Sequence, residues 1–274
     1  MKNLGIACPA CTLKWDNKKS FIAKQELLVC INCGLWFCKP DELQGIDYDE
    51  VYRTLEYQEE YFDSLDKNED WGKLTNLTAF KAFFSKIKHP PHAKLLDVGC
   101  GVGMFCRAAY SKRWDVKGID IAKSAIDKGN KNVPFTMLNC TAEEIRNNKE
   151  VFDVVTAFEV LEHLIAPYNL LNTVSELIKP GGSFFCTVPN LDCLTVKNST
   201  RKDWTPPIHV LYFTQKALQE LLTRSGFKNV VTGILWVNAP PSLPGPELVR
   251  YYVLRIKKKV GKPDPLGLWA MGSR

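Results

Sequence analysis

Ten cysteines occur in the chain, and four of them form two Cys-x-x-Cys pairs near its start. The first pair is Cys8 and Cys11, the second is Cys30 and Cys33, and 18 residues separate them. Tetrahedral zinc takes four thiolates, and two such pairs are typical of a zinc ribbon. The sequence therefore predicts a Zn²⁺ site on these four cysteines, with a structural role because four thiolates complete the coordination. The alternative is a set of free or redox-active thiols, to which Cys38 would add a spare one.

A glycine-rich turn follows a short apolar stretch in the middle of the chain. It reads Leu95-Leu96-Asp97-Val98-Gly99-Cys100-Gly101-Val102-Gly103. Glycines let the backbone turn tightly and approach a ligand closely, and the helix start beyond them presents unpaired N–H groups. The spacing is Gly-x-Gly-x-Gly and not the Gly-x-Gly-x-x-Gly of a dinucleotide site. Asp97 would also repel a pyrophosphate, whereas it suits a cationic or amine-bearing ligand.

Asp120 stands at the end of the next apolar stretch, in Gly118-Ile119-Asp120-Ile121. In a strand–helix–strand unit that binds a nucleotide, a carboxylate at the end of the second strand binds the hydroxyls of the ribose. The alternative reading is that Asp120 caps the N-terminus of a helix at 122–130.

Two carboxylates and an imidazole follow the fourth apolar stretch, at Glu159, Glu162 and His163. If this segment is helical, their spacing of i, i+3 and i+4 brings them close to one face. Such a group provides a general base, or it holds a divalent ion as a second metal site. The alternative is local: the carboxylates complement a helix N-terminus, and His163 has a purely structural role.

His209 is the second candidate base, in Pro206-Pro207-Ile208-His209 ahead of a predicted helix. Its loop should fall at the carboxyl edge of the sheet, where ligands bind. Asn190, Trp204 and Tyr212 would be its neighbours and would form an aromatic and polar platform. The alternative is that His209 only packs at the helix start.

These groups are positioned by alternating strands and helices. The strands are predicted at 95–98, 116–119, 135–138, 152–156 and 184–188, and the helices at 103–112, 122–130, 141–148 and 168–178. Strand–helix alternation at this spacing predicts an α/β fold with a doubly wound, mostly parallel sheet. A further helix at 214–225, with Thr214 as N-cap and Gly226 after its end, is followed by a strand at 228–236. A basic amphipathic helix at 246–260 and an edge strand at 266–271 complete the prediction, and 41–88 is expected to be helical.

The ordered motifs resemble those of the class I methyltransferases that use S-adenosylmethionine (SAM). The matching stretches are Leu95–Gly103, Gly118–Asp120, Phe152–His163 and Lys179-Pro180-Gly181-Gly182, within residues 90–235. The resemblance implies a Rossmann-like seven-stranded sheet, with a small zinc ribbon at 1–40, a helical linker or lid at 41–90 and the methyltransferase domain at 91–274. The residues that it implies for SAM are Asp97, Gly99, Gly101 and Gly103 at the methionine and ribose, Asp120 at the ribose hydroxyls, Ile121, Thr141 and Ala142 at the adenine, and Phe158 and Glu159 closing the site.

The nature of the methyl acceptor is indicated by motifs that are absent. Enzymes that methylate exocyclic amines resemble one another in an Asn/Asp-Pro-Pro-Tyr/Phe motif, where this chain reads Ala157-Phe158-Glu159-Val160. A Pro-Cys nucleophile, typical of RNA cytosine C5 enzymes, is also missing there, so oxygen is the leading acceptor atom. The stretch Glu159–His163 resembles that of quinone O-methyltransferases, where the similar triplet is associated with a divalent metal. The Pro-Pro-x-His stretch resembles bacterial enzymes of glycan and secondary-metabolite pathways.

We therefore predict a SAM-dependent O-methyltransferase of a sugar, sugar-nucleotide or polysaccharide precursor, with His163 or His209 as the base. The composition, 45 % hydrophobic and 24 % charged, is that of an ordinary globular protein, and no apolar run or secretory signal contradicts a cytoplasmic location. The net charge is +4 over 1–40 and +5 over 236–274, against −3 between them.

Two other functions remain open. A basic ribbon with stacking aromatics is typical of RNA-binding modules, so an RNA methyltransferase is the first alternative. The residues for that surface are Lys14, Lys18, Lys19, Lys24, Trp15 and Phe21. The ribbon is instead expected to be a lid or dimerisation element, because the central domain is acidic. A SAM-binding protein without catalytic activity is the second alternative.

Overall fold

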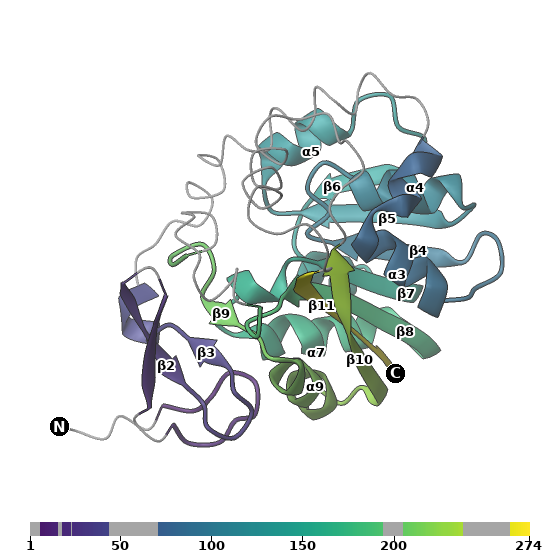
Figure 1. Cartoon of the computed structure of the whole chain (residues 1–274). Coiled ribbons are helices and arrows are strands. Elements are labelled where there is room, and N and C mark those ends of the chain that lie inside the picture. Colours follow the sequence, from purple (N-terminus) through teal and green to yellow (C-terminus); the bar gives the residue numbers. More distant parts are fainter. Residues whose placement is uncertain (1–5, 16–17, 23, 44–70, 194–204, 238–263) are drawn as a thin grey trace.

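The computed structural model describes residues 6–15, 18–22, 24–43, 71–193, 205–237 and 264–274. Over these residues the chain forms a seven-stranded sheet flanked by helices, with a smaller four-stranded sheet beside it (Figure 1). The predictions of a helix at 246–260 and of Trp204 near His209 lie outside the described residues, as does most of the segment 41–88.

The large sheet has the strand order β10-β11-β8-β7-β4-β5-β6. Its strands are β4 (Lys94–Val98), β5 (Asp115–Asp120), β6 (Thr136–Asn139), β7 (Phe152–Phe158), β8 (Ile178–Pro189), β10 (Lys228–Val237) and β11 (Asp264–Ser273). The five strands from β8 to β6 pair in parallel, and this confirms the doubly wound, mostly parallel sheet. Four of the five residues of β4 are buried, as expected for a central strand that is covered on both faces.

Helices follow the parallel strands as predicted (Figure 1). They are α4 (Met104–Ser111), α5 (Lys123–Gly129), α6 (Ala142–Asn147), α7 (Pro167–Leu177) and α9 (Gln215–Arg224), and α3 (Thr78–Lys86) precedes the sheet. Thr214 is the N-cap of α9, as predicted, and its side chain accepts a hydrogen bond from the backbone N–H of Ala217 at 3.1 Å. No helix of the described residues is long and apolar enough to cross a membrane.

The prediction of an edge strand at 266–271 is wrong in one respect. A strand is present, β11, but it lies inside the sheet and pairs antiparallel with both β8 and β10. Leu268 and Ala270 are fully buried, as the interior of a sheet requires. The edge is β10, where Val231 and Trp236 are half exposed. Sequence order suggested an edge because β11 comes last, but the chain inserts its last strand next to β8.

The small sheet is formed mainly by the N-terminal residues. It contains β1 (Lys19–Ile22), β2 (Gln25–Val29) and β3 (Trp36–Phe37), which pair antiparallel in sequence order. Its fourth strand is β9 (Leu211–Tyr212), which lies more than 170 residues further along the chain and pairs with β3. The N-terminal module therefore shares a sheet with the segment that contains His209.

Candidate active site and metal centre

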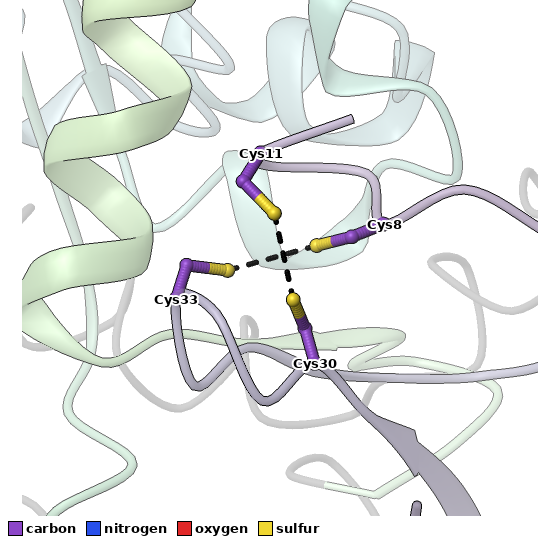
Figure 2. Close-up of side chains that lie close together, drawn as sticks. All are labelled: Cys8, Cys11, Cys30 and Cys33. Atoms are coloured by element: carbon purple, nitrogen blue, oxygen red, sulfur yellow. Dashed lines mark hydrogen bonds between the residues drawn. The ribbon is translucent and has the colours of Figure 1, made fainter. Parts of the chain in front are cut away.

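The four predicted zinc ligands meet at one point (Figure 2). Their sulfur atoms all lie within 4.8 Å of one another, with 3.6 Å between Cys8 and Cys33 and 3.4 Å between Cys11 and Cys30. Zn–S bonds of about 2.3 Å place tetrahedral sulfurs about 3.8 Å apart, so the donor set has the spacing of a Zn²⁺ site. A hydrogen bond from the Cys33 thiol lowers the pKa of Cys8 to about 5, so one thiolate forms readily. Cys38 is buried but is not among the clustered ligands, and burial raises its pKa to about 12.

The glycine turn between β4 and α4 is the first part of the candidate cofactor site. Gly99, Gly101 and Gly103 all have positive φ, at 70°, 52° and 78°. A Cβ on Gly99 would lie 2.5 Å from Val160 Cγ2, so packing requires glycine there. At Gly103 the nearest atom, Met137 Sδ at 2.6 Å, belongs to a flexible side chain, and the positive φ is what favours glycine. A Cβ on Gly101 would meet nothing within 4 Å. Gly101 therefore borders open space, where a ligand would approach the backbone.

Asp97 lies beneath this turn and is almost completely buried, with 2 % of its surface exposed. Its carboxylate accepts a hydrogen bond from the hydroxyl of Thr156 at 2.7 Å and contacts the thiol of Cys106 at 3.7 Å. Burial raises the pKa of Asp97 to about 7. A cation bound nearby would favour the ionised form, so this carboxyl can respond to a positively charged ligand.

Asp120 joins the end of β5 to the glycine turn. One carboxylate oxygen accepts from the backbone N–H of Gly101 at 2.7 Å, and the other accepts from that of Ala122 at 2.8 Å. The N-cap of α5 is Ala122, without a side-chain capping bond, so Asp120 is not the cap of that helix. Beside it, Ile121 is half exposed, and Asn139 donates to the carbonyls of both Asp120 and Ile121.

The remaining predicted cofactor residues fall into two groups. Thr141 forms a capping box with Glu144 at the start of α6, and Ala142 is buried behind it. Phe158 packs between α3 and α4, with its ring centroid 5.2 Å from Phe80 and 4.4 Å from Phe105. The structure thus gives Thr141, Ala142 and Phe158 structural contacts, and their part in cofactor binding stays a prediction.

The segment after β7 brings the acidic and imidazole groups together. Glu159 has a positive φ of 54°, a strained conformation for a side chain of this size, and it ends the strand. Its carboxylate accepts from the hydroxyl of Thr187 at 2.8 Å. A short 3₁₀ helix, η3 (Leu161–His163), follows and carries the other two groups.

Glu162, His163 and His209 form a compact group, which we call the acceptor cluster. Their potential ligand atoms all lie within 4.8 Å of one another, and the two imidazole centroids are 4.7 Å apart. Sequence reasoning grouped Glu159 with Glu162 and His163, but the third member of this cluster is His209. The i, i+3, i+4 spacing assumed an α-helix, whereas the observed turn is a 3₁₀ helix that begins after Glu159.

Burial controls the charge of the acceptor cluster. Both carboxylate oxygens of Glu162 are buried without a hydrogen-bond partner among the described residues. Burial and the neighbouring Glu159 carboxylate raise the pKa of Glu162 well above its usual range. Burial lowers the pKa of His163, while Nδ1 of its ring lies 2.9 Å from the carbonyl oxygen of Ile208 and donates to it. The cluster is therefore a polar group held in a poorly solvated place, with His163 neutral at neutral pH.

The predicted neighbours of His209 are less exposed than expected. Tyr212 is buried, and its hydroxyl donates to the carbonyl oxygen of His209 at 3.1 Å. Asn190 is buried too and donates to the carbonyl oxygen of Pro265 at 2.8 Å. Tyr212 thus holds the backbone at His209, whereas Asn190 holds the backbone at Pro265, so these two side chains do not form the expected aromatic and polar platform.

The cofactor and acceptor parts are in direct contact. The close approach of Gly99 to Val160 packs the glycine turn against the residue between Glu159 and η3. We call Asp97, the glycine turn and Asp120 the cofactor end. Val160 therefore links the glycine turn to the start of η3, which carries Glu162 and His163.

Sequence reasoning missed Thr156 and the pairing of β9 with β3. Thr156 is the polar residue of the apolar run Val154-Val155-Thr156-Ala157, and that interruption was an available signal. The strands β3 and β9 have two residues each, which is too short for the alternation of apolar and polar residues that predicts a strand.

Comparison with known proteins agrees with this architecture. A family model described as a methyltransferase domain matches residues 67–232. The chain belongs to this methyltransferase family. Two curated relatives, both named ubiquinone biosynthesis O-methyltransferase, are 34 % identical over 106 residues in Aliivibrio fischeri and 28 % identical over 156 residues in Coxiella burnetii. The alignments cover 35 % and 54 % of this methyltransferase, and 44 % and 64 % of the relatives' own length.

Solved structures show the same fold at low sequence identity. Phosphoethanolamine N-methyltransferase 2 of Haemonchus contortus, in complex with SAM, gives a TM-score of 0.59 at 13 % identity and covers 84 % of this chain and 60 % of that one. A SAM-dependent methyltransferase from Archaeoglobus fulgidus gives a TM-score of 0.53 at 18 % sequence identity. The match covers 74 % of this chain and 97 % of that one. These similarities confirm the Rossmann-like fold that the sequence predicted.

Proposed function

We propose that this methyltransferase transfers the methyl group of SAM to a hydroxyl oxygen of a small molecule. The observation that carries the proposal is the acceptor cluster, packed through Val160 against the glycine turn. The relatives named as O-methyltransferases and the missing amine and cytosine motifs support oxygen as the acceptor atom.

The cofactor end suits SAM in shape and charge. Open space beside Gly101 admits the ligand to the backbone, and Asp120 offers its carboxylate to the ribose hydroxyls. Asp97 lies below and favours the positive charge of the sulfonium and amino groups. Bound there, SAM supplies an activated methyl group, and the protein must place the acceptor oxygen in line with it.

The acceptor cluster supplies the proton acceptor. The acceptor hydroxyl loses its proton as oxygen takes the methyl group, and the sulfonium leaves as neutral S-adenosylhomocysteine. A neutral imidazole, His163 or His209, takes that proton. A phenolic hydroxyl, with a pKa of about 10, gives up its proton to imidazole more easily than an aliphatic one. We therefore propose a phenolic hydroxyl, as in a quinone precursor, as the first acceptor class. A sugar, sugar-nucleotide or polysaccharide precursor is the second acceptor class.

The same cluster also has the donor set of a divalent-metal site. Two imidazoles and a carboxylate are ligands that first-row divalent metals accept, and the unpartnered oxygens of Glu162 fit such a cation. Glu162, His163 and His209 would hold the ion, which would lower the pKa of a bound hydroxyl. We expect Mn²⁺ to raise the Tm of the protein and to have no such effect on Glu162→Gln. Equal shifts in both proteins would contradict this site.

Labelled SAM tests the function directly. Purified protein is incubated with methyl-labelled SAM and cell extract separated into quinone and lipid, glycan, small-molecule, protein and RNA fractions. Label in the quinone or small-molecule fraction supports the proposal, and label in the glycan fraction selects the second acceptor class. Label in RNA would overturn it, and would give a function to the exposed Lys14, Lys18, Lys24 and Phe21 of the ribbon. Absence of transfer to every fraction, with SAM bound, would favour a non-catalytic SAM-binding protein.

A further inference from the structure

The backbone at Val210 connects the N-terminal module to the acceptor cluster. The carbonyl oxygen of Val210 accepts from the backbone N–H of Cys38 at 3.0 Å, and its N–H donates to the carbonyl oxygen of Glu162 at 2.9 Å. Val210 is fully buried. One peptide segment, next to His209, therefore lies between the ribbon on one side and η3 on the other.

The ribbon provides the only strand that pairs with β9 within the described residues. Trp36 lies opposite Tyr212, and Phe37 lies opposite Leu211. A two-residue strand has little stability of its own. The carbonyl oxygen of Phe213 accepts a hydrogen bond from the backbone N–H of Leu191 at 2.8 Å, and β3 adds the strand pairing that holds β9 from the other side. Since the Tyr212 hydroxyl donates to the carbonyl of His209, the pairing extends to the catalytic candidate itself.

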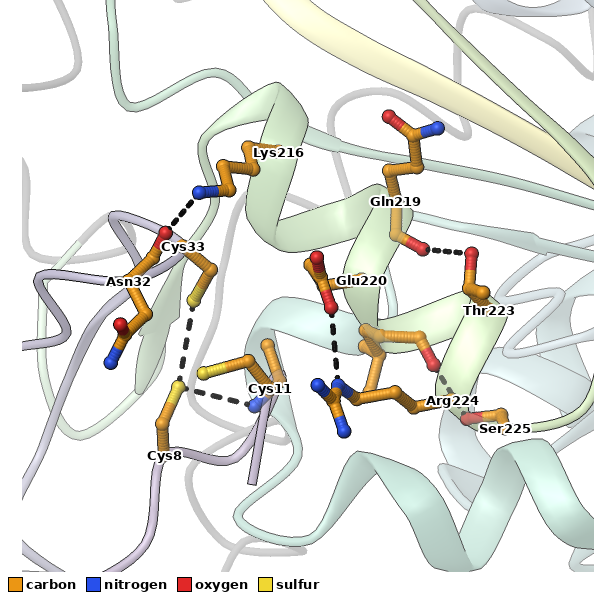
Figure 3. Close-up of polar contacts among 12 residues, drawn as sticks. Cys8, Cys11, Asn32, Cys33, Lys216, Gln219, Glu220, Thr223, Arg224 and Ser225 are labelled. Carbon is orange, nitrogen blue, oxygen red and sulfur yellow. Dashed lines mark hydrogen bonds and ion pairs between the residues drawn. The ribbon is translucent and has the colours of Figure 1, made fainter. Parts of the chain in front are cut away.

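A second anchor joins the loop of Cys30 and Cys33 to the start of α9. The hydroxyl of Thr214 donates to the carbonyl oxygen of Cys33 at 2.7 Å while also accepting from Ala217 N–H. Gly34 packs so closely that a Cβ there would lie 3.0 Å from Thr214 Cγ2. Two positions further along α9, the ammonium group of Lys216 donates to the carbonyl oxygen of Asn32 (Figure 3).

The other zinc-ligand loop is anchored as well. The hydroxyl of Tyr168, on α7, donates to the carbonyl oxygen of Ala10 at 2.6 Å. Ala10 lies between the ligands Cys8 and Cys11. Both loops that converge on the four cysteines are thus attached to helices of the methyltransferase domain.

We propose that the zinc ribbon is a positioning element for the acceptor site, with Thr214 as its main connection. The ribbon holds residues 209–214 against η3 and so keeps His209 beside Glu162 and His163. Modules of this size usually need a bound metal to fold, so zinc on the four cysteines would keep β3 and the Cys33 loop in place. The identity of the reaction comes from the proposed function, whereas the connection itself rests on the contacts described above.

Two substitutions of Thr214 separate its two hydrogen bonds. Thr214→Asp keeps the N-cap of α9, since a carboxylate accepts from Ala217 N–H, but it cannot donate to the Cys33 carbonyl. Thr214→Ser keeps both bonds and is the matched control. Hydrogen exchange of the 210–213 amides, zinc content, SAM affinity and the rate of label transfer from methyl-labelled SAM to the cell-extract fraction that accepts it are measured for both.

We expect Thr214→Asp to speed exchange at 210–213, with β7 amides unchanged. Turnover should fall about 10- to 100-fold while the Kd for SAM stays at the wild-type value, because only the acceptor end is displaced. Thr214→Ser should behave as wild type. Unchanged exchange at 210–213 in Thr214→Asp, or faster exchange with unchanged turnover, would overturn the proposal.

Hydrogen exchange of the wild-type protein before and after zinc removal provides a second measurement. It can be made even if Thr214→Asp does not fold. Faster exchange at 210–213 in the zinc-free protein supports the connection, and equal exchange in both states contradicts it. If no acceptor is ever methylated, the proposed function fails, but these exchange results still decide whether the ribbon positions residues 209–214.

Discussion

The cofactor end and the acceptor cluster lie side by side but are assembled in different ways. The cofactor end comes from two neighbouring strands and the turns that follow them, β4 with the glycine turn and β5 with Asp120. The acceptor cluster joins η3 to a segment 46 residues further along the chain, and that segment is held by strand β3 from the N-terminal module. A site made from adjacent βα turns is rigid because the sheet is rigid. A site made from distant segments depends on each contact that joins them.

The comparison predicts that substitutions at the two ends affect different steps. At the acceptor cluster, replacement of the histidine that takes the proton, by His163→Asn or His209→Asn, should lower turnover about 10²- to 10⁴-fold, the usual contribution of a general base. The Kd for SAM should stay unchanged, because neither imidazole belongs to the cofactor end. Steady-state kinetics and equilibrium SAM binding of the two variants provide the measurement.

An imidazole with only a structural role would give a different result. The substitution would then lower the free energy of unfolding of the variant. At a temperature low enough for the variant to be fully folded, its turnover would return to that of wild type. A loss of turnover in one variant only would identify which histidine takes the proton.

At the cofactor end, Asp120→Asn should weaken SAM binding about 10- to 100-fold, as expected for the loss of a hydrogen bond to a charged group. Turnover at saturating SAM should change much less than in the histidine variants. Asp127→Asn is the matched control, since Asp127 lies on the exposed face of α5 and pairs with Lys123. If both variants bound SAM as wild type does, Asp120 would have no part in cofactor binding.

The same difference explains what the sequence could predict. The cofactor end is local: an apolar strand, three glycines and an acidic residue one strand later are all visible in order. The four cysteines proposed to bind zinc are also local, in two short pairs whose spacing alone predicts a tetrahedral site. The strands of the parallel sheet could be predicted from their apolar runs. Their observed ends differ from the predicted ones by at most two residues, except that β8 begins at residue 178 and not at 184.

The acceptor cluster could be predicted only in pieces. His163 and His209 were separate candidates, and no periodic pattern indicated that their rings are 4.7 Å apart. Closeness in sequence favours Glu159 as the partner, but the backbone turns at its positive φ, and Glu162 is the carboxylate that is fully buried. The place of β11 inside the sheet could not be predicted either, since strand order depends on packing between segments that are far apart in the chain.

The smallest expected effect is the pH dependence of SAM affinity that Asp97 causes. Measuring it tests whether the cofactor end responds to the positive charge of the ligand. Burial raises its pKa to about 7, so below that pH the folded protein without ligand holds a proton on this carboxyl. A sulfonium ligand favours the ionised form, so binding should release the proton. The affinity for SAM should therefore rise with pH, by at most about tenfold for each pH unit, and level off above about pH 7.

Asp97→Asn should remove this pH dependence while keeping the size of the side chain and its hydrogen bond with Thr156. Calorimetry in buffers of different ionisation enthalpy measures the proton release directly. The unliganded proteins give a second check: the unfolded chain releases this proton near pH 4 but the folded one keeps it until about pH 7. Between these values wild type should lose stability relative to Asp97→Asn as the pH rises. Parallel pH profiles for the two proteins, in both binding and unfolding, would show that Asp97 does not sense the charge of the cofactor.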